Sequence, residues 1–374
     1  MTHPKRYISR LRLTSFRNYA SAALDLDHSH VVLTGPNGAG KTNLLEAVSL
    51  LSAGRGLRRA RFDNLAQLGS EGRWAVAATI HTPAGVVDIG TGGAPQEAGR
   101  RVRINGANAR AVDDMSEYVR MLWLTPAMDG LFSGPATDRR RFLDRLVTTL
   151  IPDHNASILG FDKAMRQRNR LLEESADPAW LGAIEVQMAA FAAAISFARI
   201  DCIAHLQQLA AGEQNGVFPA ALLALDPVFP TNEYDFASSS MLEQALIDHW
   251  RQSRPHDQRA RRTLVGPHRV DLKVTHAQKS MPARLCSTGE QKGLLIGLVL
   301  AHARLVATMT SITPLLLFDE IAAHLDPERR EALFAAIDQL NTQCFMSGTD
   351  PMLFEALAGK GVYIGVKEGR LIMA

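Results

Sequence analysis

The stretch Val31-Val-Leu-Thr-Gly-Pro-Asn-Gly-Ala-Gly-Lys-Thr42 decides the fold of this 374-residue chain. A short apolar run, typical of a buried strand, ends in a glycine-rich turn, and residues 43–51 then carry apolar side chains at helical spacing. The segment from Gly35 to Thr42 fits the pattern G-x-x-x-x-G-K-[ST], which binds phosphate when a strand precedes it and a helix follows. The sequence therefore predicts a phosphate-binding loop (P-loop) between a strand and a helix.

The chemistry of this loop indicates a nucleoside triphosphate. Glycine lets backbone N–H groups curl around an anion without a Cβ in the way, and the helix N-terminus adds about half a positive charge. Lys41 can reach the β and γ phosphates, and the Thr42 hydroxyl can ligate Mg²⁺. We expect ATP and Mg²⁺ as cofactors and Lys41 as a catalytic residue. The residues expected to contact the nucleotide are Gly35, Pro36, Asn37, Gly38, Ala39, Gly40, Lys41 and Thr42.

A second motif, Leu315-Leu-Leu-Phe-Asp-Glu320, supplies two carboxylates. Its four apolar residues predict a central parallel strand that is buried on both faces. Asp319 follows at the carboxyl end of that strand, where ligands bind in open α/β sheets. We expect Asp319 to hold Mg²⁺, through water, and Glu320 to act as a catalytic residue that polarises the attacking water.

The remaining sequence predicts one α/β domain interrupted by a helical insertion. The first part reads as strands with short turns, including hairpins at Thr82-Pro-Ala-Gly85 and Asn105-Gly106. From about residue 136 to about residue 215 apolar positions recur at helical spacing, and from about residue 262 strands and helices alternate again. We expect residues 1–125 and 262–374 to form a head, and residues 126–261 to form a mainly helical arm.

Two segments resemble motifs of the ABC-type ATPases. Ser287-Thr-Gly-Glu-Gln291 resembles their signature loop, which opens a helix and completes the ATP site of the opposite subunit. The resemblance implies an ATP-dependent homodimer, with Ser287 catalytic and Ser287, Gly289 and Gln291 on the nucleotide. Ala323-His-Leu-Asp326 resembles the D-loop, which would place Asp326 at the dimer seam and on the nucleotide. Asp326 before Pro327 also fits the N-cap of a helix, and both roles can hold.

Three further segments resemble the SMC and RecF group within that class. Ser15-Phe-Arg-Asn-Tyr19 is similar to its Phe-Arg-Asn segment, where Arg17 could pair with a phosphate and Asn18 could contact the adenine edge. Gly134-Pro-Ala-Thr-Asp-Arg-Arg-Arg-Phe-Leu-Asp144 and Val265-Gly-Pro-His-Arg-Val-Asp-Leu272 look like stretches of the RecF family. Together the motifs span nearly the whole chain, and the resemblance implies an ABC-type P-loop ATPase head with an inserted helical arm.

The same resemblance implies a function. It predicts an ATP-dependent DNA clamp of recombinational repair, replication restart and the SOS response, with weak, DNA-stimulated ATPase activity. The expected DNA is a gap or a junction between single strand and duplex. The expected protein partners are RecR and RecO, which with this chain would help RecA load onto DNA.

Two positions depart from the ABC pattern. Thr349 stands near the place of the usual switch histidine, and Asp350 follows it. The usual Q-loop glutamine is not evident, and Asp129 is the substitute candidate. Because neither replacement can act as the usual side chain does, we expect slow hydrolysis.

The net charge of +3 is too small to indicate nucleic acid by itself, so a DNA surface requires local clusters of arginine. Such clusters are also common on solvated faces, and the sequence shows no aromatic-interleaved stacking pattern, so base-specific readout is not expected. His268 is either a structural loop residue or a base. The candidate clusters are Arg55, Arg58, Arg59 and Arg61; Arg139, Arg140 and Arg141; and Arg259, Arg261 and Arg262.

Other classes remain open. A P-loop kinase or GTPase would not need the segment from Ser287 to Gln291, and no Asn-Lys-x-Asp guanine motif is present. The alternatives are a transporter-type ABC ATPase subunit and a non-catalytic interaction protein that ATP stabilises. The most apolar runs, residues 186–198 and 294–301, are shorter than the ~20 residues of a spanning helix. We expect no membrane partner, three reduced cysteines and a cytoplasmic location.

Overall fold

The computed structural model describes residues 6–95, 97, 99–211, 217–229 and 236–373. The chain divides into two compact units. The first, the head, comprises Met1–Gly130, Asn215–Ala220 and Ser287–Ala374, and the second, the arm, comprises Leu131–Gln214 and Ala221–Cys286.

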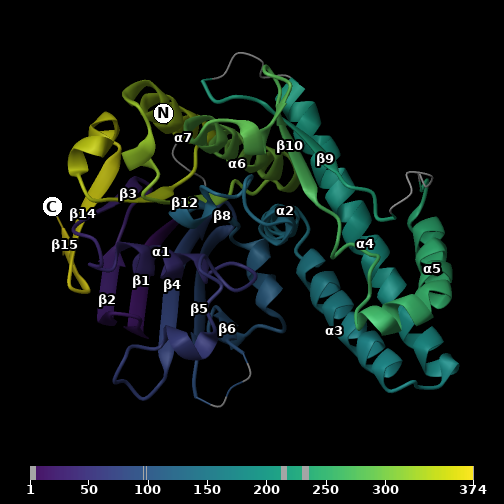
Figure 1. Ribbon diagram of the computed structural model, residues 1–374. Coiled ribbons are helices and arrows are strands. Elements are labelled where there is room, and N and C mark those ends of the chain that lie inside the picture. The colour runs from purple at the N-terminus through teal and green to yellow at the C-terminus, as the bar shows by residue number, and fades with distance from the viewer. Residues whose placement is uncertain (1–5, 96, 98, 212–216, 230–235, 374) are drawn as a thin grey trace. The chain divides into compact units, whose positions relative to one another are not determined.

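A six-stranded sheet in the order β15-β14-β3-β13-β12-β8 forms the centre of the head (Figure 1). The neighbouring strands from β14 to β8 run parallel, and β15 is antiparallel at one edge. Strands β3, β8, β12 and β13 are mostly apolar and buried, as expected when both faces of a sheet are covered. The strands are β3 (His30–Thr34), β8 (Met121–Leu124), β12 (Leu315–Asp319), β13 (Cys344–Gly348), β14 (Gly361–Lys367) and β15 (Arg370–Met373).

A second six-stranded sheet of the head is antiparallel, in the order β2-β1-β4-β5-β6-β7. It contains the two hairpins that the sequence predicted, because β4 turns into β5 at residues 82–85 and β6 into β7 at residues 105–106. Leu11 and Leu13 of this sheet share one core with Leu44 and Val48 of helix α1 and Leu33 of the parallel sheet. Its strands are β1 (Tyr7–Phe16), β2 (Tyr19–Asp25), β4 (Trp74–Thr82), β5 (Gly85–Gly93), β6 (Arg101–Ile104) and β7 (Ala107–Asn108).

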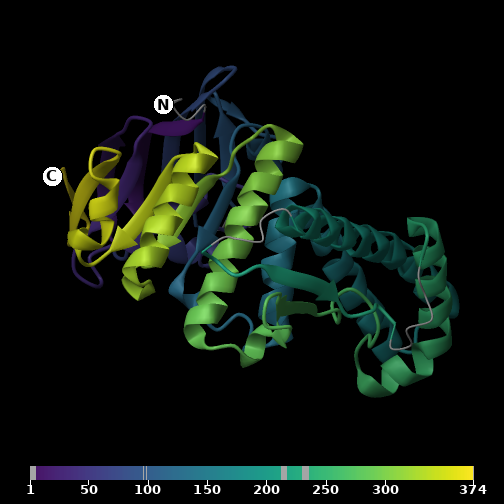
Figure 2. The same cartoon turned by 90° about the horizontal axis from the view of Figure 1, so that it is seen from above.

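Within the described residues, three α-helices complete the head. Helix α1 (Lys41–Ser49) follows the P-loop, and α6 (Thr288–Thr310) and α7 (Pro327–Leu340) lie side by side (Figure 2). Short 3₁₀ turns join these elements: η1 (Phe62–Leu65), η2 (Val112–Glu117), η3 (Pro126–Met128), η5 (Ala322–His324) and η6 (Pro351–Leu357).

The arm combines packed helices with a small sheet in the order β11-β10-β9. Phe161 of α3, Met188 of α4 and Trp250 of α5 share its core. Its elements are α2 (Ala136–Leu150), α3 (His154–Glu173), α4 (Pro178–Ala211), β9 (Ala221–Leu225), α5 (Ser239–Ala260), β10 (Leu272–His276), β11 (Met281–Pro282) and η4 (Ala283–Leu285).

The fold class expected from the sequence is confirmed, with two differences in detail. The arm begins at Leu131 rather than at residue 126, and it extends to Cys286 rather than to residue 261 because β10 pairs with β9 and therefore belongs to the arm. The strands β8 and β9 were not expected, since strands of four or five residues show no clear period and neither is followed by a motif such as those after β3 and β12.

Two helices are longer and more apolar than the sequence suggested. Pro178–Leu209 and Thr288–Thr310 each have a window of mean hydropathy 1.6, enough by length and composition to cross a membrane. Within these windows 44% and 61% of the residues are buried inside the protein, and core helices of folded proteins pass the same test.

Candidate nucleotide-binding site

The P-loop adopts a backbone that only glycine tolerates well. Gly35, Gly38 and Gly40 have φ angles of +146°, +79° and +121°. A Cβ on Gly35 would collide with the carbonyl oxygen of Val366, and a Cβ on Gly40 would lie 2.5 Å from the Asn18 side chain. The glycines of the motif therefore serve both the curl of the loop and its close packing against neighbours.

Three donors outside the loop hold its last turn. The Asn18 Nδ2 donates to the Ala39 oxygen at 3.0 Å, and the Tyr19 hydroxyl donates to the Gly40 oxygen at 3.0 Å. The backbone N–H of Gly369, in the turn between β14 and β15, also donates to the Ala39 oxygen, at 3.1 Å. These contacts come from both sheets and preorganise the loop. The sequence did not indicate Tyr19 or Gly369 as loop-holding residues.

Lys41 is folded back onto its own loop. Its Nζ donates to the backbone oxygens of Gly35 at 2.7 Å and Pro36 at 3.0 Å, and the residue is 4% exposed. A bound triphosphate would have to replace these two acceptors with phosphate oxygens, which offer the same kind of partner with more charge.

The groups predicted for Mg²⁺ lie together. The Thr42 Oγ1 donates to Asp319 Oδ1 at 2.9 Å, and the Ser347 hydroxyl donates to the same carboxylate oxygen at 2.7 Å. Ser347 pairs with Asp319 across the parallel strands β13 and β12, which explains why the sequence alone did not reveal it. Hydroxyl and carboxylate oxygens suit Mg²⁺, so the residues fit the predicted ion.

Glu320 leaves β12 in a left-handed conformation, with φ +53°. Its backbone N–H donates to the hydroxyl and the carbonyl oxygen of Ser347, at 3.0 Å and 3.2 Å. A non-glycine residue in this region costs about 1 kcal/mol or more, so Ser347 contributes to holding an unfavourable backbone. This backbone conformation places the partly exposed carboxylate of Glu320 directly after the buried Asp319.

Arg17 and Asn18 have protein partners that the sequence did not predict. Arg17 donates through Nε and Nη2 to both carboxylate oxygens of the buried Glu46 in α1, at 2.9 Å and 2.8 Å. Arg58 approaches the same carboxylate at 3.4 Å. Asn18 accepts from Asn43 Nδ2 at 2.7 Å besides holding the P-loop. In this structure both residues brace the loop and its helix, and their contacts to nucleotide stay predictions.

The signature segment forms an exposed helix tip. Ser287 caps α6: its Oγ accepts from the Glu290 N–H at 3.4 Å, and its own N–H donates to the Glu290 carboxylate at 2.9 Å. Ser287 and Gly289 are exposed, as a group that contacts another subunit must be. Gln291 differs from the prediction, because its side chain is buried within the head rather than exposed beside Ser287 and Gly289.

Asp326 performs the capping role that was one of its two predicted roles. Its Oδ1 accepts from the Arg329 N–H at 2.9 Å at the start of α7. A Cβ on Gly289 would lie 3.5 Å from Arg329 Nη1, so the tips of α6 and α7 are adjacent. The dimer-seam role of Asp326 remains a prediction.

The structure also shows the surroundings of the two positions that depart from the ABC pattern, Asp129 and Thr349. Asp129 follows η3 and forms an ion pair of 3.3 Å with the buried Lys292 of α6. Asp350 caps η6 by accepting from the Met352 N–H at 2.9 Å, and Thr349 beside it is exposed. Neither segment presents an imidazole.

In the arm, two motif residues are structural. Arg139 makes a bidentate ion pair with Asp271, at 2.9 Å and 2.8 Å, and its side chain is 15% exposed. It is therefore a poor candidate for a DNA phosphate contact. His268 Nε2 lies 3.0 Å from the Thr263 oxygen, and burial lowers the pKa of the imidazole to about 4. This supports the structural interpretation of His268.

The parallel sheet, the glycine loop, the acidic strand end and the exposed serine tip define a P-loop ATPase head of the ABC type. The family model of the RecF/RecN/SMC N terminal domain matches residues 7–368. The DNA replication and repair protein RecF of Rhizobium meliloti is 51% identical over 371 residues, covering 98% of this chain and 99% of that protein. RecF of Mesorhizobium japonicum is 51% identical over 367 residues, covering 97% of each. The chain belongs to the RecF family.

Solved structures agree on the fold. The recombination mediator protein RecF with ATP, from the RecFOR pathway, matches with a TM-score of 0.85 at 20% identity, covering 100% of both chains. The Smc head domain of Pyrococcus furiosus with bound ScpA domain matches with a TM-score of 0.54 at 15% identity, covering 99% of this chain and 96% of the other.

Proposed function

We propose that this chain is an ATP-gated DNA clamp of recombinational repair. It dimerises on gapped DNA and on single-strand/duplex junctions when ATP is bound, and hydrolysis releases it. With RecR and RecO it helps RecA load, during replication restart and the SOS response in the cytoplasm. The names of its relatives as DNA replication and repair proteins, and the solved complex of RecF with ATP, support this proposal.

The observation that carries the proposal is the convergence of Thr42, Asp319 and Ser347 beside a braced glycine loop. Thr42 and Asp319 would hold Mg²⁺, which offsets negative charge on the phosphates when bound. Lys41 would move from the carbonyls of its own loop to a phosphate oxygen. Glu320, held just past Asp319, is placed to accept a proton from water.

The exposed tip of α6 supports the proposed dimerisation. A serine hydroxyl, a glycine N–H and a helix N-terminus together form an anion-binding surface. Ser287 and Gly289 are exposed at the N-terminus of α6, so they are free to contact a nucleotide held by a second copy.

Size measurement by light scattering, with ATP, Mg²⁺ and gapped DNA, tests the gating. Lys41→Met should remain a monomer because the phosphates lose their cation, and Glu320→Gln should stay dimeric on DNA because hydrolysis stops. Lys163→Met and Glu331→Gln change exposed residues elsewhere and serve as matched controls. If both site variants assemble and dissociate as the wild type does, the gating mechanism is wrong.

A further variant separates capping from ligand binding at Ser287. Ser287→Asn keeps a good N-cap, so the unfolding temperature should stay close to that of the wild type. The amide lacks a hydroxyl and is larger, so the ATP-dependent dimer should be lost. Retention of a normal dimer would remove Ser287 from the proposed interface.

A non-catalytic protein that ATP stabilises is the second candidate. The exposed Thr349 and the Asp129–Lys292 ion pair favour it, because the residues that usually sense the γ-phosphate are replaced. Phosphate release with and without gapped DNA distinguishes the two. Turnover that Glu320→Gln abolishes supports the enzyme, and the absence of turnover under both conditions supports the second candidate.

A further inference from the structure

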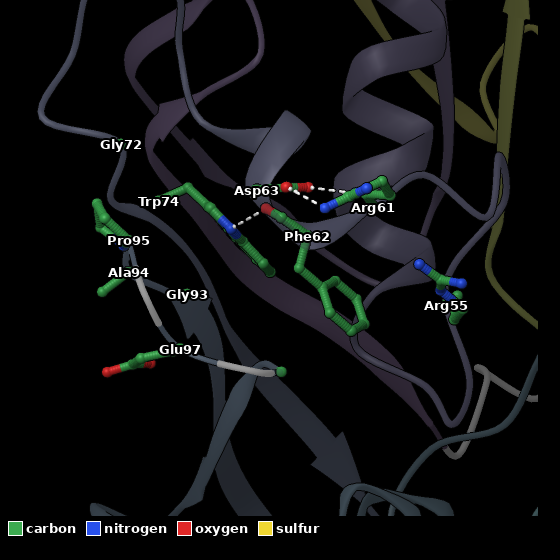
Figure 3. A pocket seen from close by; sticks show the side chains of 11 residues that line it. Arg55, Arg61, Phe62, Asp63, Gly72, Trp74, Gly93, Ala94, Pro95 and Glu97 are labelled. Carbon is green, nitrogen blue, oxygen red and sulfur yellow. Dashed lines mark hydrogen bonds and ion pairs between the residues drawn. The ribbon is translucent and has the colours of Figure 1, made fainter.

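A pocket of about 450 Å³ lies in the head beside η1 and the hairpin β4–β5 (Figure 3). Its lining includes two aromatic residues, Phe62 and Trp74, and two arginines, Arg55 and Arg61. These residues come from two separate segments of the chain. The sequence shows no aromatic-interleaved stacking pattern because Phe62 and Trp74 are 12 residues apart, and the fold brings them to one pocket.

The aromatic residues form a fixed platform. Trp74 Nε1 donates to the Phe62 oxygen at 2.8 Å, and the two ring centroids are 6.4 Å apart. Trp74 also packs edge-on against Phe16, with centroids 5.8 Å apart, and is 3% exposed. Gly93 lies close against the indole, where a Cβ would come within 2.8 Å of Trp74 Nε1. The platform is therefore held by the core of the head, while the Phe62 side of it is partly open.

Guanidinium groups surround this platform. The Cζ atoms of Arg55 and Arg100 lie 5.7 Å and 5.8 Å from the centroid of Phe62. Arg55 is exposed, and its bond to the Ala60 oxygen is long at 3.5 Å. Arg61 pairs with Asp63 at 2.9 Å, an exposed contact that a phosphate can replace at small cost. The lining therefore offers two guanidinium groups, Arg55 and Arg61, against the carboxylate of Asp63. The other acidic residue of the lining, Glu97, is paired with Arg101.

We propose that this pocket binds one nucleotide of an unpaired DNA strand. The base lies against the Phe62 ring, Arg55 turns from that ring onto the base, and Arg61 turns from Asp63 to the adjoining phosphate. A π-face with exposed guanidinium groups at the mouth is the chemistry that holds single-stranded nucleic acid. A stacked base pair does not present a free face, so the pocket selects single strand over duplex. The assignment rests on the DNA binding proposed above.

The pocket is also connected to the P-loop helix. Arg17 donates to η1 through its backbone N–H, to Leu65 oxygen at 2.8 Å, and through Nη1, to Asn64 oxygen at 2.9 Å. The same arginine holds Glu46 of α1. Arg100 donates to the oxygens of Ser52 at 2.6 Å and Gly54 at 3.0 Å, just past the end of α1. A strand seated on Phe62 therefore contacts elements that are bonded to the helix carrying Lys41 and Thr42.

The test uses the full chain, ATP, and oligonucleotides carrying one 5-iodouracil in a single-stranded tail. Ultraviolet cross-linking followed by peptide mapping should place the adduct on Phe62 or Trp74. In anisotropy titrations Phe62→Leu and Arg55→Gln should each bind tailed DNA about tenfold more weakly, the usual loss for one stacked base. Blunt duplex should bind these variants as it binds the wild type. Phe62→Tyr should restore tail binding, and Arg103→Gln, an exposed arginine of β6, is the control.

Three results would overturn the assignment: adducts that map outside the pocket, tail binding unchanged in both variants, or displacement of the tail by free dTMP at equal nucleotide concentration. The last result would make the ligand a mononucleotide rather than a strand. If Phe62→Leu fails to fold, Arg55→Gln at the exposed mouth carries the test. A wild-type protein that binds neither tailed nor blunt DNA would contradict the proposed function, which distinguishes that failure from failure of the pocket alone.

Discussion

Gly35 and Gly38 of the P-loop differ in the space available for a side chain. Gly35 lies against the backbone of Val366, whereas no atom would lie within 4 Å of a Cβ on Gly38. Both have positive φ, so alanine strains the backbone at either position. Only at Gly35 does a methyl group also have to push β14 away from the loop.

We predict that Gly35→Ala is far more damaging than Gly38→Ala. Gly38→Ala should cost about 1 kcal/mol of unfolding free energy, as expected for backbone strain alone. Gly35→Ala should cost about 2 kcal/mol more because of overpacking, and ATP affinity should fall with it. Chemical denaturation and titration with a fluorescent ATP analogue measure the two effects. Equal losses in both variants would contradict the role given to Val366.

At the residue scale, the sequence could identify side chains but not their partners. The spacing of the motifs was enough to associate Thr42 with Asp319, which form a hydrogen bond. Arg17 was recognised as a motif residue, but its partner Glu46 is buried in a helix that only the tertiary fold brings close. Ser347 could not be predicted, because its place depends on the register of two parallel strands.

At the element scale, one buried ion network joins three helices of the arm. Arg168 of α3 is fully buried and pairs with Glu185 of α4 at 3.0 Å and Asp257 of α5 at 2.7 Å. Its Nη2 also donates to the Trp250 oxygen at 2.9 Å. Arg254 gives Glu185 a second cation at 2.6 Å. The network therefore sets how α3, α4 and α5 meet within the arm.

We predict that Arg168→Met destabilises the arm by about 3–5 kcal/mol, because it leaves Asp257 buried without its cation. Arg170→Met is the matched control on the same helix: Arg170 pairs with Glu174 on the surface, so its loss should have little effect. Urea denaturation followed by circular dichroism compares the two. A loss below about 1 kcal/mol for Arg168→Met would show that water enters and solvates the network.

A neighbouring motif or turn signal, rather than length alone, decided which short elements the sequence revealed. The helical spacing of residues 43–51 and 136–215 predicted helices, the flanking motifs predicted the five-residue strands β3 and β12, and turn signals predicted the two hairpins of the antiparallel sheet. The short strands β8 and β9 were missed, and missing β9 moved the expected end of the arm. A strand of five residues is defined by the neighbour it pairs with, and that neighbour was 47 residues further along, at Leu272 opposite Leu225.

At the scale of the whole molecule, the two units should respond to different conditions. The ATP site lies in the head, so ATP at a hundred times its Kd should stabilise the head by about 2.7 kcal/mol. His268 lies in the arm, and burial lowers its pKa from 6.5 to about 4. Since the unfolded chain binds the proton more readily, the arm should lose up to about 3 kcal/mol as the pH falls from 6.5 towards 4.

We therefore predict that calorimetric scans show a transition that ATP raises and another that acid lowers. His268→Gln should make the acid-sensitive transition less dependent on pH between 6.5 and 4, without changing the shift that ATP produces. The wild type at pH 7.5 serves as the reference, where His268 is neutral in both states. A single transition that moves with both ATP and pH would show that the units unfold together.

The contact between Gly369 and Ala39 links segments that are far apart in the sequence, because the hairpin β14–β15 supports the P-loop that follows β3. A premature stop or a protease cut that removes only the final half-dozen residues would remove a hydrogen bond that supports the ATP site. An affinity tag fused at that end would disturb the same hairpin. ATP binding measured on such a fusion should therefore be compared with that of an untagged or amino-terminally tagged protein.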